Sequence, residues 1–170
     1  MKKITPFLWF DTQAEEAMNF YVDTFNGAPN KKQESRIVSI TRYEKGMDAP
    51  GAEALEGKVI TGIFELAGQR FMALDGGPVF QFNGAISLYV ECEDQNEVDY
   101  FWSKLSAVPE AEQCGWCMDR FGLSWQIIPK QLGELMGDPN PEKSQRVMNA
   151  MLKMKKIIVA DLQKAYEGAS

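Results

Sequence analysis

The stretch Phe7-Leu8-Trp9-Phe10-Asp11-Thr12, followed at once by the run Ala14–Phe25, decides the fold. Four apolar residues in succession predict a strand that is buried on at least one face. Thr12 and Glu15 have the spacing of a capping box, which predicts a helix start between them. The run after them has one apolar or small face at i, i+3, i+4 and i+7, made of Ala17, Phe20, Tyr21 and Thr24. The stretch therefore predicts a strand that leads directly into an amphipathic helix.

The same pattern occurs a second time in the chain. Ile86–Val90 is apolar, Asp94 stands three residues before Glu97, and the helical run Gln95–Leu105 follows. Its apolar face has the same i, i+3, i+4, i+7 spacing, made of Val98, Phe101, Trp102 and Leu105. Two copies of one strand–helix unit are therefore expected.

Further strands are predicted after each helix, separated by glycine-containing turns. They are Arg36–Tyr43, Val59–Leu66 and Gln69–Leu74 in the first half, and Glu112–Met118 and Ser124–Ile128 in the second. A short strand near Val108 is either irregular or missing. The expected fold is α+β, with two βαβββ modules that form a curved mixed-sheet trough and a C-terminal helical tail.

At 170 residues the chain has the size of one domain. We expect a single domain, residues 1–170, with a first module at 4–75, a second at 84–130 and the tail at 131–170. The tail is predicted to be helical from Pro141, with a last helix at Ala160–Tyr166. It either covers the sheet or packs against a partner chain.

Composition and charge exclude several classes of function. The net charge is −6, and no cluster of Lys and Arg with interleaved aromatics is present, so no nucleic-acid partner is expected. No apolar run approaches the ~18 residues of a membrane span, and no signal peptide is recognisable, so no membrane partner and a cytoplasmic location are expected. The three cysteines are expected to be free thiols.

The chain contains no histidine. Histidine is the usual general base near neutral pH and the commonest transition-metal ligand. Ser-His-Asp and Cys-His catalytic arrangements are therefore impossible, and no cofactor is predicted. A zinc site would need cysteine and carboxylate ligands alone, and a calcium or magnesium site remains open. No catalytic residue can be assigned from the sequence.

Alternate residues of a strand face opposite sides of a sheet, so the pattern predicts which side chains line the trough. In the first strand Phe7 and Trp9 are expected to face the helix. The predicted small-molecule pocket is lined by Leu8, Phe10, Met72, Leu74, Ser87, Tyr89, Glu91, Cys114, Trp116, Ser124 and Gln126. This surface is apolar in the first half and semi-polar in the second, which suits a small organic ligand.

Some pocket candidates have a plainer interpretation. Gln126 and Ser87 either bind a ligand or hydrogen-bond to each other or to water. Cys114 and Cys117 have a C-x-x-C spacing, which is typical of redox pairs. They lie in a predicted strand, however, where residues three apart point to opposite faces, so a redox pair is disfavoured. Met148, Met151 and Met154 indicate packing or a dimer seam.

Two motifs resemble those of one family. They are Phe7-Leu8-Trp9-Phe10-Asp11 with Ala14-Glu15-Glu16-Ala17-Met18-Asn19-Phe20-Tyr21, and Cys114-Gly115-Trp116-Cys117-Met118-Asp119-Arg120-Phe121-Gly122-Leu123-Ser124-Trp125-Gln126-Ile127-Ile128-Pro129. Both are similar to bacterial PhnB-like proteins of the vicinal-oxygen-chelate superfamily, which also holds glyoxalases and bleomycin-resistance proteins. The resemblance covers about residues 4 to 130 and implies paired βαβββ modules in a homodimer.

The resemblance also implies ligand positions for a metal, at Ile4, Met72, Ala85 and Gln126. Three of these cannot bind a cation through their side chains, so the metal is expected to be absent here. The family is often labelled 3-demethylubiquinone-9 3-methyltransferase. The strand, glycine-rich turn and helix that an adenosyl methyl donor needs are not found, because Gly76-Gly77 leads into Pro78.

Two functions remain open at this point. One is a metal-independent enzyme on a small metabolite, with catalysis by Tyr89, Gln126, Glu91 or Cys114. The other is a binding protein without turnover, which the acidic net charge and the lack of a carboxylate–base pair favour.

Overall fold

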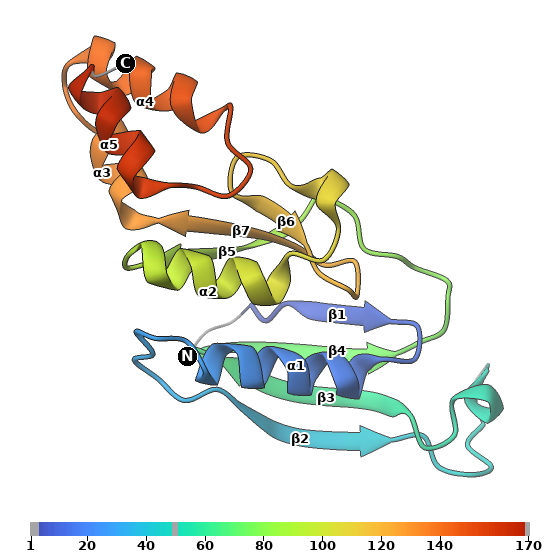
Figure 1. Cartoon of the computed structure of the whole chain (residues 1–170). Coiled ribbons are helices and arrows are strands. Elements are labelled where there is room, and N and C mark those ends of the chain that lie inside the picture. The colour runs from blue at the N-terminus through green and yellow to red at the C-terminus, as the bar shows by residue number, and fades with distance from the viewer. Residues whose placement is uncertain (1–3, 49–50, 169–170) are drawn as a thin grey trace. The chain divides into compact units, whose positions relative to one another are not determined.

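A computed structural model of the chain describes residues 4–48 and 51–168. The chain divides into two compact units between Phe82 and Asn83, within the segment that was predicted to join the two halves. Each unit contains a sheet and helices (Figure 1), and the predicted α+β class with a helical C-terminal region is confirmed.

The first unit is the predicted strand–helix–three-strand module. Its elements are β1 (Phe7–Phe10), α1 (Ala14–Asn26), β2 (Arg36–Arg42), a 3₁₀ turn (Ala52–Leu55), β3 (Val59–Leu66) and β4 (Gln69–Asp75). The strand order is β1-β4-β3-β2, with β1 parallel to β4 and the other pairs antiparallel. Helix α1 lies across one face of this sheet (Figure 1), where Tyr21 stacks on Phe64 with ring centroids 6.4 Å apart.

The predicted facing of β1 is wrong. Leu8 and Phe10 are 8% and 3% exposed and lie on the helix side, whereas Phe7 is 48% exposed. Strand β4 sets this facing, because Phe10 is in register with Asp75, and Asp75 lies at the start of α1. The Trp9 indole N–H donates to the carbonyl of Gly77 at 2.9 Å, which holds that ring away from the helix.

The predicted capping box at Thr12 and Glu15 is also wrong. No side chain of the preceding residues caps α1. Instead, the buried carboxylate of Asp75 accepts from the backbone N–H of Ala14 at 2.8 Å and from that of Val59 at 2.9 Å. Asp75 thus supplies the acceptor that a helix N-terminus needs, while Glu15 is engaged by Arg42 instead. A pattern of local residues could not reveal a cap that comes from 61 positions away.

The second unit begins with β5 (Ser87–Cys92) and α2 (Gln95–Leu105), and here the predicted cap is confirmed. Asp94 accepts from the backbone N–H of Glu97 at 3.0 Å, and Glu97 accepts in turn from that of Glu93 at 2.7 Å. The strands β6 (Trp116–Met118) and β7 (Ser124–Pro129) complete a sheet of order β5-β7-β6. Strand β5 is parallel to β7, and β6 is antiparallel to it.

One strand of the second module is missing, as the sequence left open. Val108 is extended, but it leads into a 3₁₀ turn at Pro109–Ala111. A single backbone hydrogen bond, from Ala107 N–H to the carbonyl of Met118 at 2.9 Å, replaces the ladder among the described residues there.

The predicted strand Glu112–Met118 is interrupted by a tight turn. Cys114 and Gly115 both have positive φ, at 51° and 84°, and Gln113 and Trp116 exchange backbone hydrogen bonds around them. Two successive residues with positive φ are typical of a type I′ hairpin turn. Cys114 is therefore in a turn, and the prediction that it lies in a strand is wrong.

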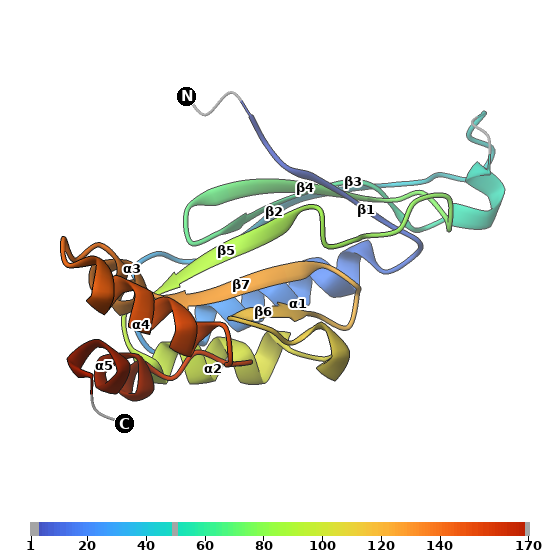
Figure 2. The ribbon, with the colours of Figure 1, turned by 90° about the horizontal axis from the view of Figure 1, so that it is seen from above.

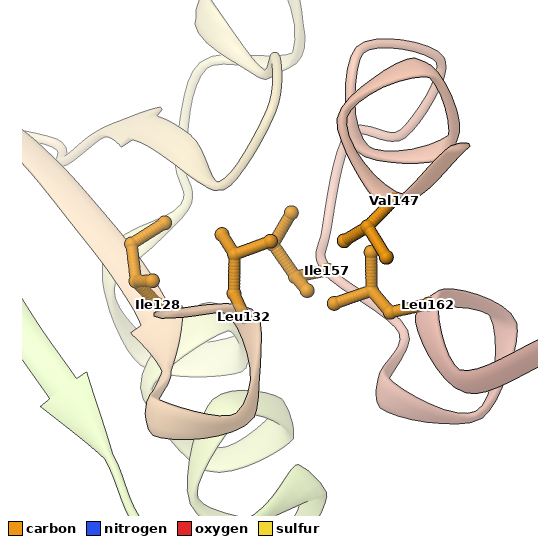
Figure 3. Close-up of a cluster of buried hydrophobic side chains, with 5 residues drawn as sticks. All are labelled: Ile128, Leu132, Val147, Ile157 and Leu162. Atoms are coloured by element: carbon orange, nitrogen blue, oxygen red, sulfur yellow. The ribbon is translucent and has the colours of Figure 1, made fainter. Parts of the chain in front are cut away.

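The C-terminal region packs on its own unit. Its helices are α3 (Lys130–Met136), which was not predicted, α4 (Pro141–Met151) and α5 (Val159–Glu167). They gather beyond the end of β7 (Figure 2). Their shared core contains Ile128, Leu132, Val147, Ile157 and Leu162 (Figure 3), with Met151 and Met154 against it. Both methionines are thus packing residues.

The segment between α4 and α5, residues 152–158, is held along the rest of the second unit, and we call it the strap. Its carbonyls at Met154 and Lys155 accept from the backbone N–H groups of Cys114 and Gly115 at 2.8 and 2.7 Å. Gln95 donates to the carbonyl of Ile157 at 3.1 Å, and Lys156 pairs with Asp99 at 2.6 Å. Within the described residues, none of the helices has the length and apolar character that a membrane crossing requires.

Candidate functional site

The face of the second sheet that is turned away from α2 carries most of the predicted pocket residues. Its opposite face is buried and contains Val90, Cys117, Trp125 and Ile127. Across the open face, Tyr89 of β5, Gln126 of β7 and Trp116 of β6 stand in one row, because each is in register with its neighbour. Tyr89 is 57% exposed, and Gln126 and Trp116 are partly buried.

A second row lies beside the first. It contains Ser87, Ser124 and Met118, again in register. Ser124 is buried and Ser87 is half-buried. The amide nitrogen of Gln126 donates to the hydroxyl oxygen of Ser87 at 2.8 Å. Ser87 and Gln126 therefore bond to each other, which was the plainer of their two interpretations, and this bond fixes the orientation of the amide.

Tyr89 and Glu91 follow each other on the same face of β5. Partial burial, together with the carboxylate charge of Glu91, raises the pKa of the Tyr89 hydroxyl above its ordinary value. Tyr89 therefore stays protonated near neutral pH and is a hydrogen-bond donor there. A raised pKa makes it a poor general acid, which weighs against the enzymatic role considered for it.

The first sheet contributes less than predicted to an open face. Met72 and Leu74 are partly buried and in register with Phe7 and Trp9, on the side away from α1. Leu8 and Phe10 were expected beside them but lie on the helix side, because the facing of β1 is reversed. The open face of the first sheet therefore presents Phe7 and Trp9 instead.

The cysteines do not form a reactive pair. Burial raises the pKa of Cys117 to about 12, and likewise that of Cys92 to about 12. Cys114 lies in the hairpin turn and is partly exposed. Thiolates are the reactive form of cysteine, so the buried thiols are inert near neutral pH.

Asp119 supports the open face, and sequence reasoning missed it. Its buried carboxylate accepts from the indole N–H of Trp125 at 2.8 Å and from the backbone N–H groups of Phe121 and Leu123 at 2.8 and 3.1 Å. It thereby fixes the turn between β6 and β7 and the register of both strands. The signal for this role was the Asp-x-x-Gly turn beside a tryptophan.

The first unit also has a polar groove of about 460 Å³ at the start of α1. It is lined by Thr12, Gln13, Glu15, Glu16, Asn19, Arg42, residues 56–59 and Asp75. A two-pronged ion pair between Arg42 and Glu15, at 2.7 and 2.8 Å, lies in it, and this contact lowers the pKa of Glu15. Its charges are thus largely paired within the chain, and none of the predicted pocket residues lines it.

The residues at the four metal positions that the resemblance implies do not fit a metal. The side chains of Ile4, Met72 and Ala85 offer no oxygen or nitrogen ligand, and the amide oxygen of Gln126 would be a lone ligand. Among residues 4–48 and 51–168, no three His, Cys, Asp or Glu side chains gather closely enough to hold an ion.

These two units define a class of protein in which α+β modules of one strand, one helix and two or three further strands are used in tandem. The family model for 3-demethylubiquinone-9 3-methyltransferase matches residues 2–128. The chain belongs to this family, and the helices α3, α4 and α5 lie beyond the matched region. A comparison with curated proteins finds no significant match.

The chain is similar to several solved structures, including the following two. A putative 3-demethylubiquinone-9 3-methyltransferase, PhnB protein, from Bacillus cereus is 40% identical, with 75% of this chain and 99% of that chain covered and a TM-score of 0.59. Protein PA1353 from Pseudomonas aeruginosa is 17% identical, with 76% and 98% covered and a TM-score of 0.56, which supports the fold alone.

The family's description implies a methyl donor, and the structure does not fit one that carries an adenosyl group. Gly76 and Gly77 follow β4, but no helix begins between them and β5 among the described residues. The strand, glycine-rich turn and helix that would hold an adenosyl group are therefore missing at the chain's only glycine pair.

Proposed function

We propose that the protein binds a small organic molecule on the open face of the second sheet, without a bound metal. One observation carries the proposal. Tyr89, Gln126 and Trp116 form an in-register row of an aromatic, an amide and an aromatic side chain on a face that α2 does not cover. Few polar groups among aromatic ones are typical of small-molecule sites.

Binding without turnover is favoured over catalysis. The raised pKa of Tyr89 opposes proton transfer near neutral pH, and Gln126 is fixed by Ser87 and has no titrating proton. Metal-independent turnover by Tyr89, Gln126, Glu91 or Cys114 is the alternative that the test below must reject. Three free thiols also support the proposal that the protein works in the reducing cytoplasm.

Native mass spectrometry on gently purified protein tests this function. The expected result is an organic adduct without metal, which is lost in Gln126→Ala and Tyr89→Ala but kept in Tyr100→Ala, a tyrosine variant on α2. An adduct that is chemically changed during incubation, in the presence of a chelator, would overturn binding without turnover. A stoichiometric metal would overturn metal independence.

We also propose a homodimer. The tail gives no support for it, because its apolar faces are covered within the chain. Support comes from exposed large apolar side chains elsewhere, Phe7, Val79, Phe80 and Ile86, which are 48–74% exposed.

A further inference from the structure

We propose that the ligand of this face is a planar aromatic cation that carries N–H donors. The inference rests on the proposed function and narrows it to one chemical class. Three features of the row carry it: the spacing of two aromatic side chains, the fixed amide between them, and the carboxylate beside them.

The spacing suits one ring between two others. Tyr89 and Trp116 stand on strands that are separated by β7, so their backbones are about 10 Å apart, since neighbouring strands lie about 4.8 Å apart. Side chains stand roughly perpendicular to a sheet. A ligand ring midway between them has both aromatic centroids at about 5 Å, within the range that aromatic pairs prefer.

The floor of this gap accepts hydrogen bonds. Because the nitrogen of the Gln126 amide donates to Ser87, the atom that Gln126 can offer to a ligand is its oxygen Oε1. No hydrogen bond among the described residues uses that oxygen. An amide oxygen in this position selects a ligand that donates, such as one with a ring N–H or an amino group.

The charge beside the row is negative. Glu91 is exposed on the same face of β5 as Tyr89, and its charge contributes to the raised pKa of Tyr89. Tyrosine and tryptophan faces attract cations as well. Carboxylate, amide oxygen and two ring faces together favour a cation over a neutral or anionic ring of the same size.

Calorimetry with three probes of matched size tests the inference on the full chain. The probes are 4-aminoquinoline as its protonated cation, neutral 1-aminonaphthalene and the anion 2-naphthoate. We expect the cation to bind most tightly, and more weakly as salt is added. Tyr89→Ala, Trp116→Leu and Gln126→Leu should each weaken its binding roughly three- to tenfold.

Glu91→Gln separates charge from shape. This substitution should weaken binding of the cation and make that binding less dependent on salt. It should leave the affinity for 1-aminonaphthalene unchanged. Glu110→Gln removes an exposed carboxylate from another part of the same unit and should change nothing, and so should Tyr100→Ala. Far-ultraviolet circular dichroism identifies any variant that fails to fold, for which Tyr89→Leu and Trp116→Phe are the substitutes.

The outcomes separate the two proposals. Equal or tighter binding of 2-naphthoate, lost in the Tyr89 variant, would overturn the cation class and keep the site. If the cation binds equally well to the variants of Tyr89, Trp116, Gln126 and Glu91, the binding site does not lie on this face. No probe binding, with an organic adduct seen by native mass spectrometry, would overturn the ligand class alone, and no binding of any kind would overturn both.

Discussion

Two buried aspartates hold the local geometry of this protein at the scale of single residues. Asp75 joins the start of α1 to the start of β3, and Asp119 joins the β6–β7 turn to Trp125. Each carboxylate accepts hydrogen bonds from two backbone N–H groups. The partners of Asp75 lie 61 and 16 positions away, so the sequence could not reveal its role. The partners of Asp119 lie within six positions, and the Asp-x-x-Gly turn beside Trp125 was a local signal for its role.

Substitution of Asp119 should lower the stability of the protein. Asp119→Ala leaves the Trp125 indole N–H and two backbone N–H groups without their acceptor, and the expected loss is at least about 2 kcal/mol of unfolding free energy. Urea denaturation measures it. Asp94→Ala, which removes a single N-terminal cap, should cost about 1 kcal/mol. Equal losses in the two variants would contradict the role assigned to Asp119.

Thiol reactivity should follow burial. At pH 8 a thiol-specific reagent is expected to modify one cysteine of the folded protein, Cys114, and all three after denaturation. The pKa of about 12 for Cys92 and for Cys117 keeps both protonated at that pH. Mass spectrometry of digested protein locates the label. Rapid labelling of Cys117 in the folded state would contradict its burial.

At the scale of elements, the sequence predicted most of the fold and less of the site. The elements of the first unit differ from their predicted bounds by at most one residue, because helical and strand periods are local properties. The prediction of which side chains of β1 face the helix was wrong, because its four residues are all apolar and show no alternation of apolar and polar side chains. In the second unit the facing of β5 and β7 was right, because Ser87 and Gln126 broke the apolar pattern.

The contacts of the strap should make the stability of the second unit depend on pH. Glu112 has its pKa lowered by Ser106 and Lys155, and Asp99 has its pKa lowered by Lys156 and Gln95. A lowered folded-state pKa adds stability above the ordinary values of 4.5 and 3.8, and this stability is lost as the pH falls below them. We therefore expect the strap to loosen as the pH falls below the ordinary pKa values of these two carboxyl groups.

Nuclear magnetic resonance can follow this change through the amide protons of Cys114 and Gly115, which bond to the strap. Their signals should shift as these carboxyl groups are protonated, while that of Gly122, bonded to the carbonyl of Asp119, should stay. Lys156→Gln removes the partner of Asp99 and should weaken the dependence. Signals of all three amides that move together would indicate unfolding of the whole unit instead.

At the scale of the whole molecule, the exposed apolar side chains predict self-association. Sedimentation at micromolar concentration should give twice the chain mass of 19.2 kDa. Phe80→Ser and Val79→Ser, on the segment after β4, should shift the equilibrium toward monomer, because both side chains are more than 60% exposed. Leu152→Ser, an exposed apolar position in the strap, is the matched control. A single monomer mass at all concentrations would rule the dimer out.

The position of the strap also sets an order of events during synthesis. The ribosome makes the chain from its N-terminus, and domains tend to fold as they emerge. The sheet and helix of the first unit are complete once Asp75 has been made. The second unit must wait for residues 152–158, because the hairpin turn and α2 bond to them. A nascent chain paused before that point would leave Ile128 and Leu132 uncovered, and exposed apolar surface of this kind promotes aggregation.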